Sequence, residues 1–446
     1  MEPISLRAAS RVWLRIGLLS FGGPAGQIAL MHGELVDRRR WISDARFLHA
    51  LSFCTLLPGP EAMQLATYVG FLMHRLPGAL VAGGLFVLPG ALVMLALSAL
   101  YGAFHRSFLV EALFLGLKAA VVALVVHAVA RVAKRALKGP VHWAVAGASF
   151  VALLAFQVPY PAVVLATGLL GAVLGARAAG QGGAAAAATA VPTLIDAMEA
   201  RGELAHARPS WRRTVATFAV GLALWALPLL GVAWALGPES LWAKEARLFS
   251  EAAVVTFGGA YAVLGFIAHQ VVELGWLSPQ QMVDGLGLAE TTPGPLILVL
   301  EFVGFLSAHQ HPGGLSPFGA GALGAAVTLW ATFVPCFLWI LAGAPWVEAL
   351  RGNVRLRGAL GLITAAVVGV IAQLSLWFAL HTLFAQVGER ALGPVRLPWP
   401  ELATVQWPAA VLCAVALVLV LRTRVGVGWV LAGCSAGGLA ARLLAG

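Results

Sequence analysis

Residues 57–60 read Leu-Pro-Gly-Pro, and residues 292–295 read Thr-Pro-Gly-Pro. The first Pro-Gly-Pro begins 17 residues after Trp41, and the second begins 17 residues after Trp276. Two uncommon tripeptides at the same spacing from a tryptophan indicate that one ancestral segment is present twice in the chain.

The flanking sequence extends this match in both directions. Upstream, the chain reads Phe-Gly-Gly-Pro-Ala-Gly from Phe21 and Phe-Gly-Gly-Ala-Tyr-Ala from Phe257. Downstream, it reads Tyr-Val-Gly-Phe at 68–71 and Phe-Val-Gly-Phe at 302–305. The sequence therefore predicts two homologous repeats.

The composition is that of a membrane protein. Of 446 residues, 60% are apolar and only 11% are charged, which is too little charge for a water-soluble surface of this size. Stretches such as Pro77 to Tyr101 and Phe302 to Trp346 contain no Asp, Glu, Lys or Arg. Because about 20 apolar residues cross a bilayer, we expect an all-α integral membrane protein with about 13 transmembrane segments.

Glycines, prolines and charge clusters delimit the expected apolar segments. These run over 12–31, 46–73, 78–101, 108–130, 141–156, 159–176, 214–236, 248–270, 283–308, 319–343, 358–382, 407–421 and 425–444. The expected domains are a first repeat at 1–176, a flexible Ala-rich linker at 177–213, a connecting transmembrane segment at 214–246, and a second repeat at 247–446.

The connecting segment has a topological consequence. Six segments precede it, so the second repeat starts on the opposite side of the membrane, and the repeats are expected to be inverted, as in many secondary transporters. The distribution of Lys and Arg favours a cytoplasmic N-terminus and a C-terminus outside. Arg38 to Arg40 and Arg46 oppose this orientation, unless 12–31 is a re-entrant pair of half-helices.

The Gly- and Pro-containing motifs interrupt apolar segments, where lipid offers no water to the freed backbone groups. Pro24 and Pro60 suit the first position of a helix. A helix that begins near mid-membrane directs unpaired N–H groups and a positive dipole end into the bundle, which predicts an anion site. The expected helix starts follow Gly23, Pro60, Gly259 and Pro295. Proline kinks and close-packing glycines are the alternative.

Polar side chains near the breaks are candidate donors to a bound oxyanion. They are Ser20, Gln27, Thr55, Gln64, Thr67, Tyr68, Thr256, Tyr261, Thr291 and Thr292. Each hydroxyl could instead bond back to its own helix. His49, His74 and His269 are candidate proton relays, with hydrogen-bonded packing as the alternative.

Ionisable residues within apolar segments are candidates for proton coupling or gating, because charge is costly in a membrane. They are Glu61, Lys118, Glu290 and Glu301. An ionised Glu61 would repel a bound anion, so its protonation could be linked to occupancy; capping of the helix is the alternative. For Lys118 the alternative is that its ammonium reaches the membrane interface.

Other function classes find little support. The net charge of +10 lies in short loops and not on a basic face with aromatics, so no nucleic-acid partner is expected. The four cysteines lack metal-binding spacing and are expected to be small buried residues. Without a Walker A sequence, or HExxH or GxSxG in a suitable context, we expect no ATP hydrolysis, no catalytic residue, no cofactor and no metal.

The chain resembles the chromate ion transporter family in four stretches: SFGGPAGQIALMHGELVDRRRWI (20–42), LPGPEAMQLATYVG (57–70), FGGAYAVLGFIAHQVV (257–272) and GLAETTPGPLILVLEFVGF (287–305). The likeness covers both halves and leaves the linker unmatched. The family's motif positions carry over as Gly22, Gly23, Pro24, Gly26, Gln27, Pro58, Gly59, Pro60 and Glu61, and as Gly258, Gly259, Pro293, Gly294 and Pro295. The second copy lacks equivalents of Pro24 and Glu61, so the repeats are expected to differ in role.

The resemblance implies a two-domain bacterial exporter in the inner membrane. Such a protein moves chromate, a tetrahedral dianion, out of the cytoplasm with the energy of the electrochemical gradient and confers chromate resistance. Uptake or exchange of sulfate is the alternative, other transport such as a channel comes next, and a membrane-embedded enzyme is a distant third. Protons are a further candidate partner besides the lipid bilayer, and a homodimer is as compatible with the sequence as a monomer.

Overall fold

The computed structural model describes residues 4–21, 23–55, 57–105, 107–178, 193–255, 260–347, 354–393, 395–423 and 425–445. The first half contains α1 (Leu6–Leu19), α2 (Gly23–His32), a π-helical turn η1 (Gly33–Arg38), α3 (Asp44–Cys54), α4 (Glu61–Phe104), α5 (Phe108–Ala136), α6 (Pro140–Phe156) and α7 (Tyr160–Ala178). The joining segment contains α8 (Leu194–Ala200), the 3-10 turn η2 (Glu203–Ala207) and α9 (Trp211–Leu236).

The second half contains α10 (Leu241–Val255), α11 (Ala260–Glu273), α12 (Pro279–Thr291), η3 (Leu296–Leu298), α13 (Val299–Gln310), α14 (Pro317–Gly343), η4 (Ala344–Trp346) and α16 (Val354–Leu383). The strands β1 (Val387–Leu392) and β2 (Val395–Pro400), the turn η5 (Leu402–Thr404), and the helices α17 (Trp407–Arg422) and α18 (Val427–Ala445) complete it.

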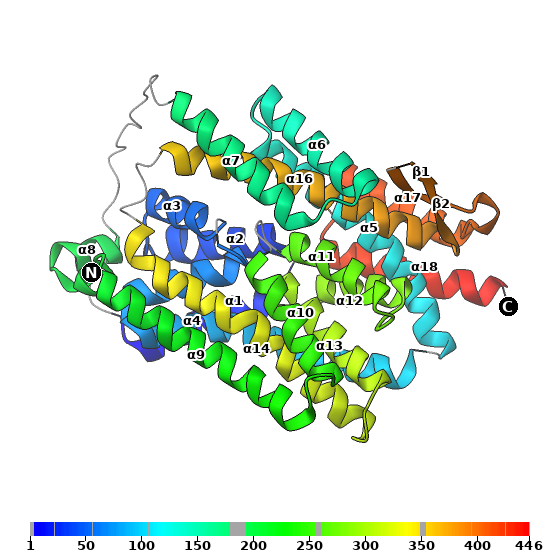
Figure 1. Cartoon of the computed structure of the whole chain (residues 1–446), viewed down its shortest axis with the longest axis horizontal. Helices are drawn as coiled ribbons and strands as arrows, with labels where there is room; N and C mark the ends of the chain where they lie inside the picture. Colours follow the sequence, from blue (N-terminus) through cyan, green and yellow to red (C-terminus); the bar gives the residue numbers. More distant parts are fainter. Residues whose placement is uncertain are drawn as a thin grey trace.

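Long apolar helices dominate the structure. Within the described residues, five helical stretches in α4, α5, α9, α14 and α16 are long and apolar enough to cross a membrane. Figure 1 shows α7, α9, α14 and α16 running in a common direction. The N-terminus, α3 and α8 lie at one end of the molecule, called here the N-terminal end, and the β-hairpin and C-terminus lie at the other, called the hairpin end.

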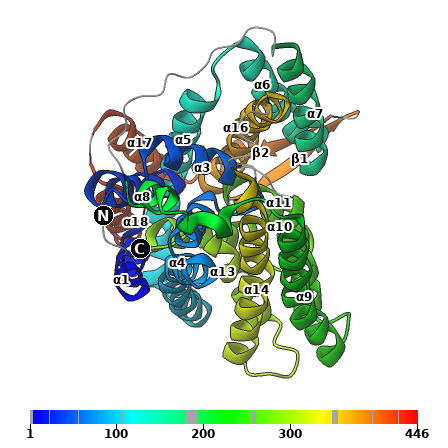
Figure 2. The same ribbon diagram turned by 90° about the vertical axis from the view of Figure 1, so that its left-hand side faces the viewer.

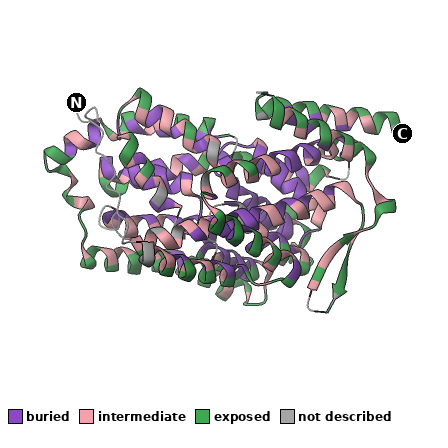
Figure 3. Ribbon diagram, turned by 90° about the horizontal axis from the view of Figure 1, so that it is seen from above, coloured by how far each residue is buried: buried purple, intermediate pink, exposed green. Residues whose placement is uncertain are grey.

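The outer helices expose large apolar side chains. On α9, Trp211, Leu227 and Trp234 are 71%, 65% and 89% exposed. Figure 3 shows buried residues concentrated in the centre of the molecule and exposed ones on the peripheral helices. Such faces are stable when lipid covers them, which agrees with a multi-pass membrane protein.

Short helices replace two of the expected spans. The helices α1, α2 and α3 contain 14, 10 and 11 residues, so the longest extends about 21 Å, less than the roughly 30 Å of a bilayer core. The segments 12–31 and 46–73 are therefore wrong as single spans, because each holds two short helices separated by a Gly-Pro break. The total of about 13 segments remains a prediction.

The helix α4 is itself two helices joined by a sharp turn. At His74 and Arg75 the torsions are not helical, and Arg75 has a φ of +56°. Gly70 before the turn lies against the backbone of Gly78 after it. In the second half Gly304 of α13 lies in the same way against Gly324 of α14. Glycines let these pairs of backbones approach closely, as is common between membrane helices.

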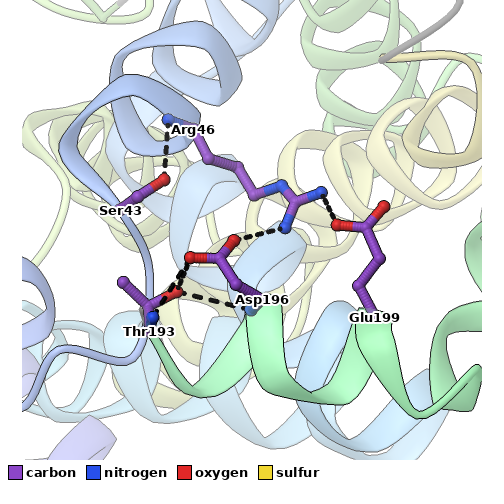
Figure 4. A network of polar contacts seen from close by, with 5 residues as sticks. All are labelled: Ser43, Arg46, Thr193, Asp196 and Glu199. Atoms are coloured by element: carbon purple, nitrogen blue, oxygen red, sulfur yellow. Dashed lines mark hydrogen bonds and ion pairs between the residues drawn. The ribbon is translucent and has the colours of Figure 1, made fainter. Parts of the chain in front are cut away.

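The end of the expected flexible linker is folded, which corrects the prediction for 193–207. Thr193 and Asp196 form a capping box at the start of α8, and Ile195 is fully buried. Figure 4 shows Arg46 of α3 in contact with two carboxylates of α8, at 3.2 Å from Asp196 and 2.7 Å from Glu199. Buried apolar contact and these ion pairs fix α8 to the first half, whereas most of the Ala-rich tract, 179–192, lies outside the described residues.

A β-hairpin, which the apolar pattern of the sequence does not predict, interrupts the helical pattern between α16 and α17. The strands β1 and β2 pair antiparallel, with Val387 opposite Pro400 and Leu392 opposite Val395. Arg390 lies over the ring of Trp399, 5.0 Å from its centre. Figure 2 shows the hairpin projecting from the helical body near α16.

Candidate functional site

Three glycines at the breaks have torsions that other residues rarely adopt. The φ angle is +66° at Gly23, +109° at Gly59 and +89° at Gly294. Glycine is favoured there because a Cβ atom would clash with its own backbone. At these positions the chain makes true turns between separate helices, so the alternative of simple proline kinks does not describe them.

The two Pro-Gly-Pro motifs have similar conformations. Pro60 has φ −76° and ψ 108°, and Pro295 has φ −65° and ψ 136°. A helix begins at the next residue in each case, α4 at Glu61 and η3 followed by α13 at Leu296. No side chain caps either start. The helix starts expected after Pro60 and Pro295 are confirmed, and each leaves first-turn N–H groups without a capping side chain.

The breaks of the two halves contact each other. The Gly294 N–H donates to the carbonyl oxygen of Ser20 at 3.1 Å and to its hydroxyl oxygen at 3.2 Å. The side-chain amide of Gln27 donates to the Gly294 carbonyl at 2.7 Å. Ser20, Gln27 and Pro293 are all buried. The Gly294 N–H is thus already bonded to Ser20 and is not a free donor for an anion, which the sequence does not predict.

The second part of α4 supports these breaks through its glycines. A Cβ at Gly90 would collide with the carbonyl oxygen of Pro293, and one at Gly83 would collide with the hydroxyl of Thr67. Gly17 of α1 lies against the backbone of Leu85 in the same stretch. Short helices of both halves therefore pack directly on one short stretch of α4.

The first Pro-Gly-Pro motif contacts α14 of the second half. A Cβ at Gly59 would lie 2.5 Å from the Sγ of Cys336. Gln64 donates its amide to the Pro58 carbonyl at 2.8 Å, and its Oε1 has no hydrogen-bond partner among the described residues although it is buried. Each Pro-Gly-Pro motif thus meets the other half of the chain.

Most candidate hydroxyls bond to their own helices, as the alternative for them stated. Thr67 donates to the Met63 carbonyl, Thr291 to that of Leu288 and Thr292 to that of Ala289. Gly22, Thr256, Gly258 and Gly259 lie outside the described residues, as does the side chain of Tyr261. In α2, Gly26 packs against the Phe21 carbonyl and Pro24 occupies the first turn.

A cavity of about 450 Å³ lies toward the hairpin end of the molecule. Its walls come from α4, α5, α12, α16 and α18, with Gln406 also contributing. At its buried side the Lys118 ammonium lies 3.0 Å from the Oδ1 of Asp284, and the Tyr101 hydroxyl donates to Oδ2 at 2.7 Å. Lys118 is therefore paired with a buried carboxylate, and Asp284 was not among the residues predicted from the sequence.

Comparison with known proteins assigns the chain to a family. A sequence model of the family described as chromate transporter matches residues 8–176 and 244–439, which lie in the two halves. The chain belongs to the chromate transporter family. No solved structure matches it.

Three relatives of the chain are named as chromate transport proteins, one of them as a probable one. The chain is 34% identical to a chromate transport protein of Pseudomonas aeruginosa, over 83% of this chain and 80% of the relative. It is 29% identical to a chromate transport protein of Cupriavidus metallidurans, over 82% of this chain and 81% of the relative. It is 28% identical to a probable chromate transport protein of Synechococcus elongatus, over 82% of this chain and 83% of the relative. These names describe transport proteins and not enzymes.

The three candidate carboxylates of this chromate transporter family member lie on three different helices. Glu61 occupies the first turn of α4 directly after Pro60, and Glu301 occupies the first turn of α13. Glu301 is 2% exposed, and its Oε2 has no hydrogen-bond partner among the described residues. Glu290 is also buried, near the end of α12. All three lie within two helical turns, along the sequence, of a Pro-Gly-Pro motif.

The three candidate histidines behave as packing or surface residues. His49 bonds to the Val347 carbonyl at 2.9 Å, and His74 bonds to the Ile4 carbonyl at 2.7 Å. His269 is 63% exposed and lies 3.8 Å from Glu273. The hydrogen-bonded alternative thus describes His49 and His74 better than a proton relay.

A second, smaller cavity lies toward the N-terminal end. It has a volume of about 190 Å³ and is lined by Arg46, Tyr68, Glu199, Arg208 and Pro345, among others. Residues of α8, η2 and the chain that follows form one wall. The folded part of the joining segment therefore covers this end of the molecule beside Tyr68, one of the candidate donors.

Proposed function

We propose that this protein exports chromate, or a tetrahedral oxyanion like it, from the cytoplasm across the bacterial inner membrane. The observation that carries the proposal is the contact between breaks of the two halves, where Ser20 and Gln27 bond to Gly294. A site built from two halves can open toward either side when the halves shift relative to each other. The chromate transport proteins among the relatives supply the substrate class.

The backbone around the breaks supports an anion as the substrate. The helices that begin after Pro60 and Pro295 direct positive dipole ends into the protein and carry no capping side chains. Gly23, Pro24, Gly26, Pro58 and Gly59 shape the turns on the first-half side. We infer that a dianion binds among these turns, without a dedicated cation at its centre.

The helix hairpins support an inverted arrangement of the repeats. In the first half, the turn at His74 lies at the N-terminal end, because His74 bonds to Ile4. In the second half, α14 ends at Gly343 beside Phe53 of α3, and its 27 residues extend about 40 Å away from there. The corresponding turn between α13 and α14 is thus at the opposite end, as two inverted copies require.

The positions of basic residues support a cytoplasmic N-terminus. Arg38, Arg39 and Arg40 lie between α2 and α3, and the Arg40 carbonyl bonds to the N–H of Leu194 in α8. These arginines therefore lie at the N-terminal end with α8, and this position supports a cytoplasmic location for them. Under the positive-inside rule this end faces the cytoplasm and the C-terminus lies outside.

The membrane potential favours export. Moving a dianion outward across an inside-negative potential of about 100 mV releases about 4.6 kcal/mol, enough for a gradient of roughly two thousandfold. Secondary active transport of this kind would confer chromate resistance. Glu61, Glu290 and Glu301 are the proposed sites of any added proton coupling at the breaks.

The test is uptake of radiolabelled chromate into everted membrane vesicles, with and without an ionophore and excess sulfate. We compare the protein with Gly59→Leu, which places a side chain at a φ of +109° and against Cys336. The matched control is Gly231→Leu on the exposed face of α9, where an added Cβ meets no atom within 4 Å.

Saturable uptake that the ionophore and Gly59→Leu abolish, with Gly231→Leu active, supports the proposal. Gly59→Leu must be present in the membrane at the control level for its loss of transport to count. Normal uptake by Gly59→Leu would remove the break site from the proposal, and inhibition by sulfate at equal concentration would broaden the substrate to sulfate. Absence of uptake by the unaltered protein overturns chromate export.

A further inference from the structure

The cavity at the hairpin end becomes more buried from its mouth to its floor. Near the mouth, Glu111 and Arg442 form an ion pair of 3.2 Å, and their side chains are 48% and 49% exposed. At the floor, Lys118 is 20% exposed and Asp284 only 7%. The cavity thus leads from the hairpin end of the molecule to a charged pair within the helical body.

The two oxygens of the floor aspartate have different partners, and its Oδ1 is buried without a hydrogen-bond partner among the described residues. Asp284 holds Lys118 with one oxygen and accepts the Tyr101 hydroxyl with the other. Lys118 has three N–H donors, and its ammonium lies at ion-pair distance from Asp284 and borders the cavity. A second negatively charged partner could therefore approach Lys118 from the cavity side.

The pair is connected to the breaks through α12. Asp284 precedes Thr292 by about two turns of helix, roughly 12 Å along the axis. Beside the pair, Gly287 of α12 packs closely on Leu117 and Val121 of α5. A change in the attraction between Lys118 and Asp284 would therefore act on the helix that ends at the second Pro-Gly-Pro motif.

We propose that a tetrahedral oxyanion in this cavity competes with Asp284 for the Lys118 ammonium. The ion pair is the anion-free state. When Asp284 takes up a proton from water in the cavity, its attraction for Lys118 falls, and the ammonium turns to the oxyanion. When Asp284 loses that proton, it displaces the anion and so promotes release at this end. No covalent bond changes, and Lys118 keeps its charge throughout.

The substrate class in this inference rests on the proposed function. Other titratable or charged groups line the same cavity: Tyr101 on α4, His105 directly after α4, Glu111 on α5, His381 on α16 and Arg442 on α18. His309 of α13 lies nearby, beside Gly102 of α4. Asp284 differs from them because it alone binds Lys118 in the described structure. A test must therefore separate Asp284 from the histidines.

The experiment measures binding of sulfate and of chromate to the purified full-length protein in nanodiscs by titration calorimetry, from about pH 6 to about pH 8. We compare Asp284→Asn, Lys118→Gln, the double variant and His381→Gln. Asp284→Asn should bind at least about tenfold more tightly than the unaltered protein at the upper pH, because a competing ion pair is removed, and should lose most of its pH dependence.

The remaining variants control for structure and for the histidines. Lys118→Gln should lose binding in this cavity, whereas the double variant, which leaves no unpaired charge, should fold normally and bind as weakly as Lys118→Gln. His381→Gln should keep the pH dependence. Unaltered affinity and pH profile in Asp284→Asn, or in the double variant, overturn the inference.

Vesicle uptake distinguishes this inference from the proposed function. If the unaltered protein transports chromate and the Lys118 and Asp284 variants keep its KM and pH profile, the inference fails and export stands. If the unaltered protein neither binds nor transports an oxyanion, both the proposed function and this inference are wrong.

Discussion

Gly294 has both a left-handed backbone torsion and close contacts with neighbouring atoms. Its φ is +89°, and an added Cβ would lie 3.0 Å from the Cδ1 of Leu298 and 3.2 Å from the Cα of Gly90. Gly314 has a similar φ of +92°, but an added Cβ there would meet no atom within 4 Å. The two positions separate backbone strain from packing.

We therefore expect Gly294→Ala to lose more stability than Gly314→Ala. Both changes should cost about 1–2 kcal/mol for the torsion, and only Gly294→Ala should add a packing cost and impair transport. Thermal unfolding in detergent and vesicle uptake measure the two effects. Equal losses in both variants would mean that the torsion alone matters.

Gln27→Ala tests the bond between the halves. Removal of the amide leaves the buried Gly294 carbonyl without that donor, which should cost about 1–3 kcal/mol and reduce uptake. The control is Gln270→Ala on α11, a half-buried amide with no hydrogen bond in the described structure. The prediction is contradicted if the two variants unfold at the same temperature.

His32 gives a pH-dependent contribution at the polar N-terminal end, outside the apolar spans. Its hydrogen bond to Asp44, with help from Asp37, raises the pKa of His32 above its usual 6.5. A raised folded-state pKa stabilises the protein at pH below 6.5, and this stabilisation disappears as the pH rises through the folded-state pKa. His32→Gln should therefore lower the melting temperature more at about pH 5.5 than at about pH 8.5. A constant difference across this range would contradict the assignment.

At the scale of elements, α8 shows how a short helix is held by a neighbour. Arg46, only 15% exposed, bridges Asp196 and Glu199. Arg46→Gln should increase the rate at which trypsin cleaves after Arg201 and Arg208 several-fold, because α8 opens locally, while the melting temperature changes little. Glu203→Gln breaks only a local, exposed pair with Arg201 and should cleave at the normal rate. Equal rates in the two variants would show that other contacts hold α8.

The elements also show which features the sequence can predict. Gly-Pro breaks and helix starts are local, so the motifs around Gly59 and Gly294 predict their own turns. The contact of Ser20 with Gly294 joins residues 274 apart, and no local pattern reports it. Asp284 could have been found, because a lone aspartate and a lone lysine in separate apolar helices often pair. The Thr193 and Asp196 capping box is likewise a local sequence pattern that predicts the start of α8.

At the scale of the whole molecule, the proposed orientation can be tested with cysteine labelling. Glu203→Cys and Glu389→Cys place thiols on exposed residues at opposite ends, whereas the four native cysteines are buried. A membrane-impermeant maleimide should label Glu389→Cys in intact spheroplasts and Glu203→Cys only after permeabilisation. The opposite pattern would reverse the orientation, and labelling of both from outside would contradict the arrangement of the two ends.

The helix α9 has consequences for how such a protein can arise. Among its residues only Trp225 is buried, so α9 contributes little to the interior and can tolerate many apolar substitutions. Tandem duplication of an ancestral gene whose product crosses the membrane an even number of times yields two copies of the same orientation. In the proposed inverted arrangement, acquisition of one such permissive crossing between them would account for the orientation of the second copy, without any change to the residues that the two copies had already inherited.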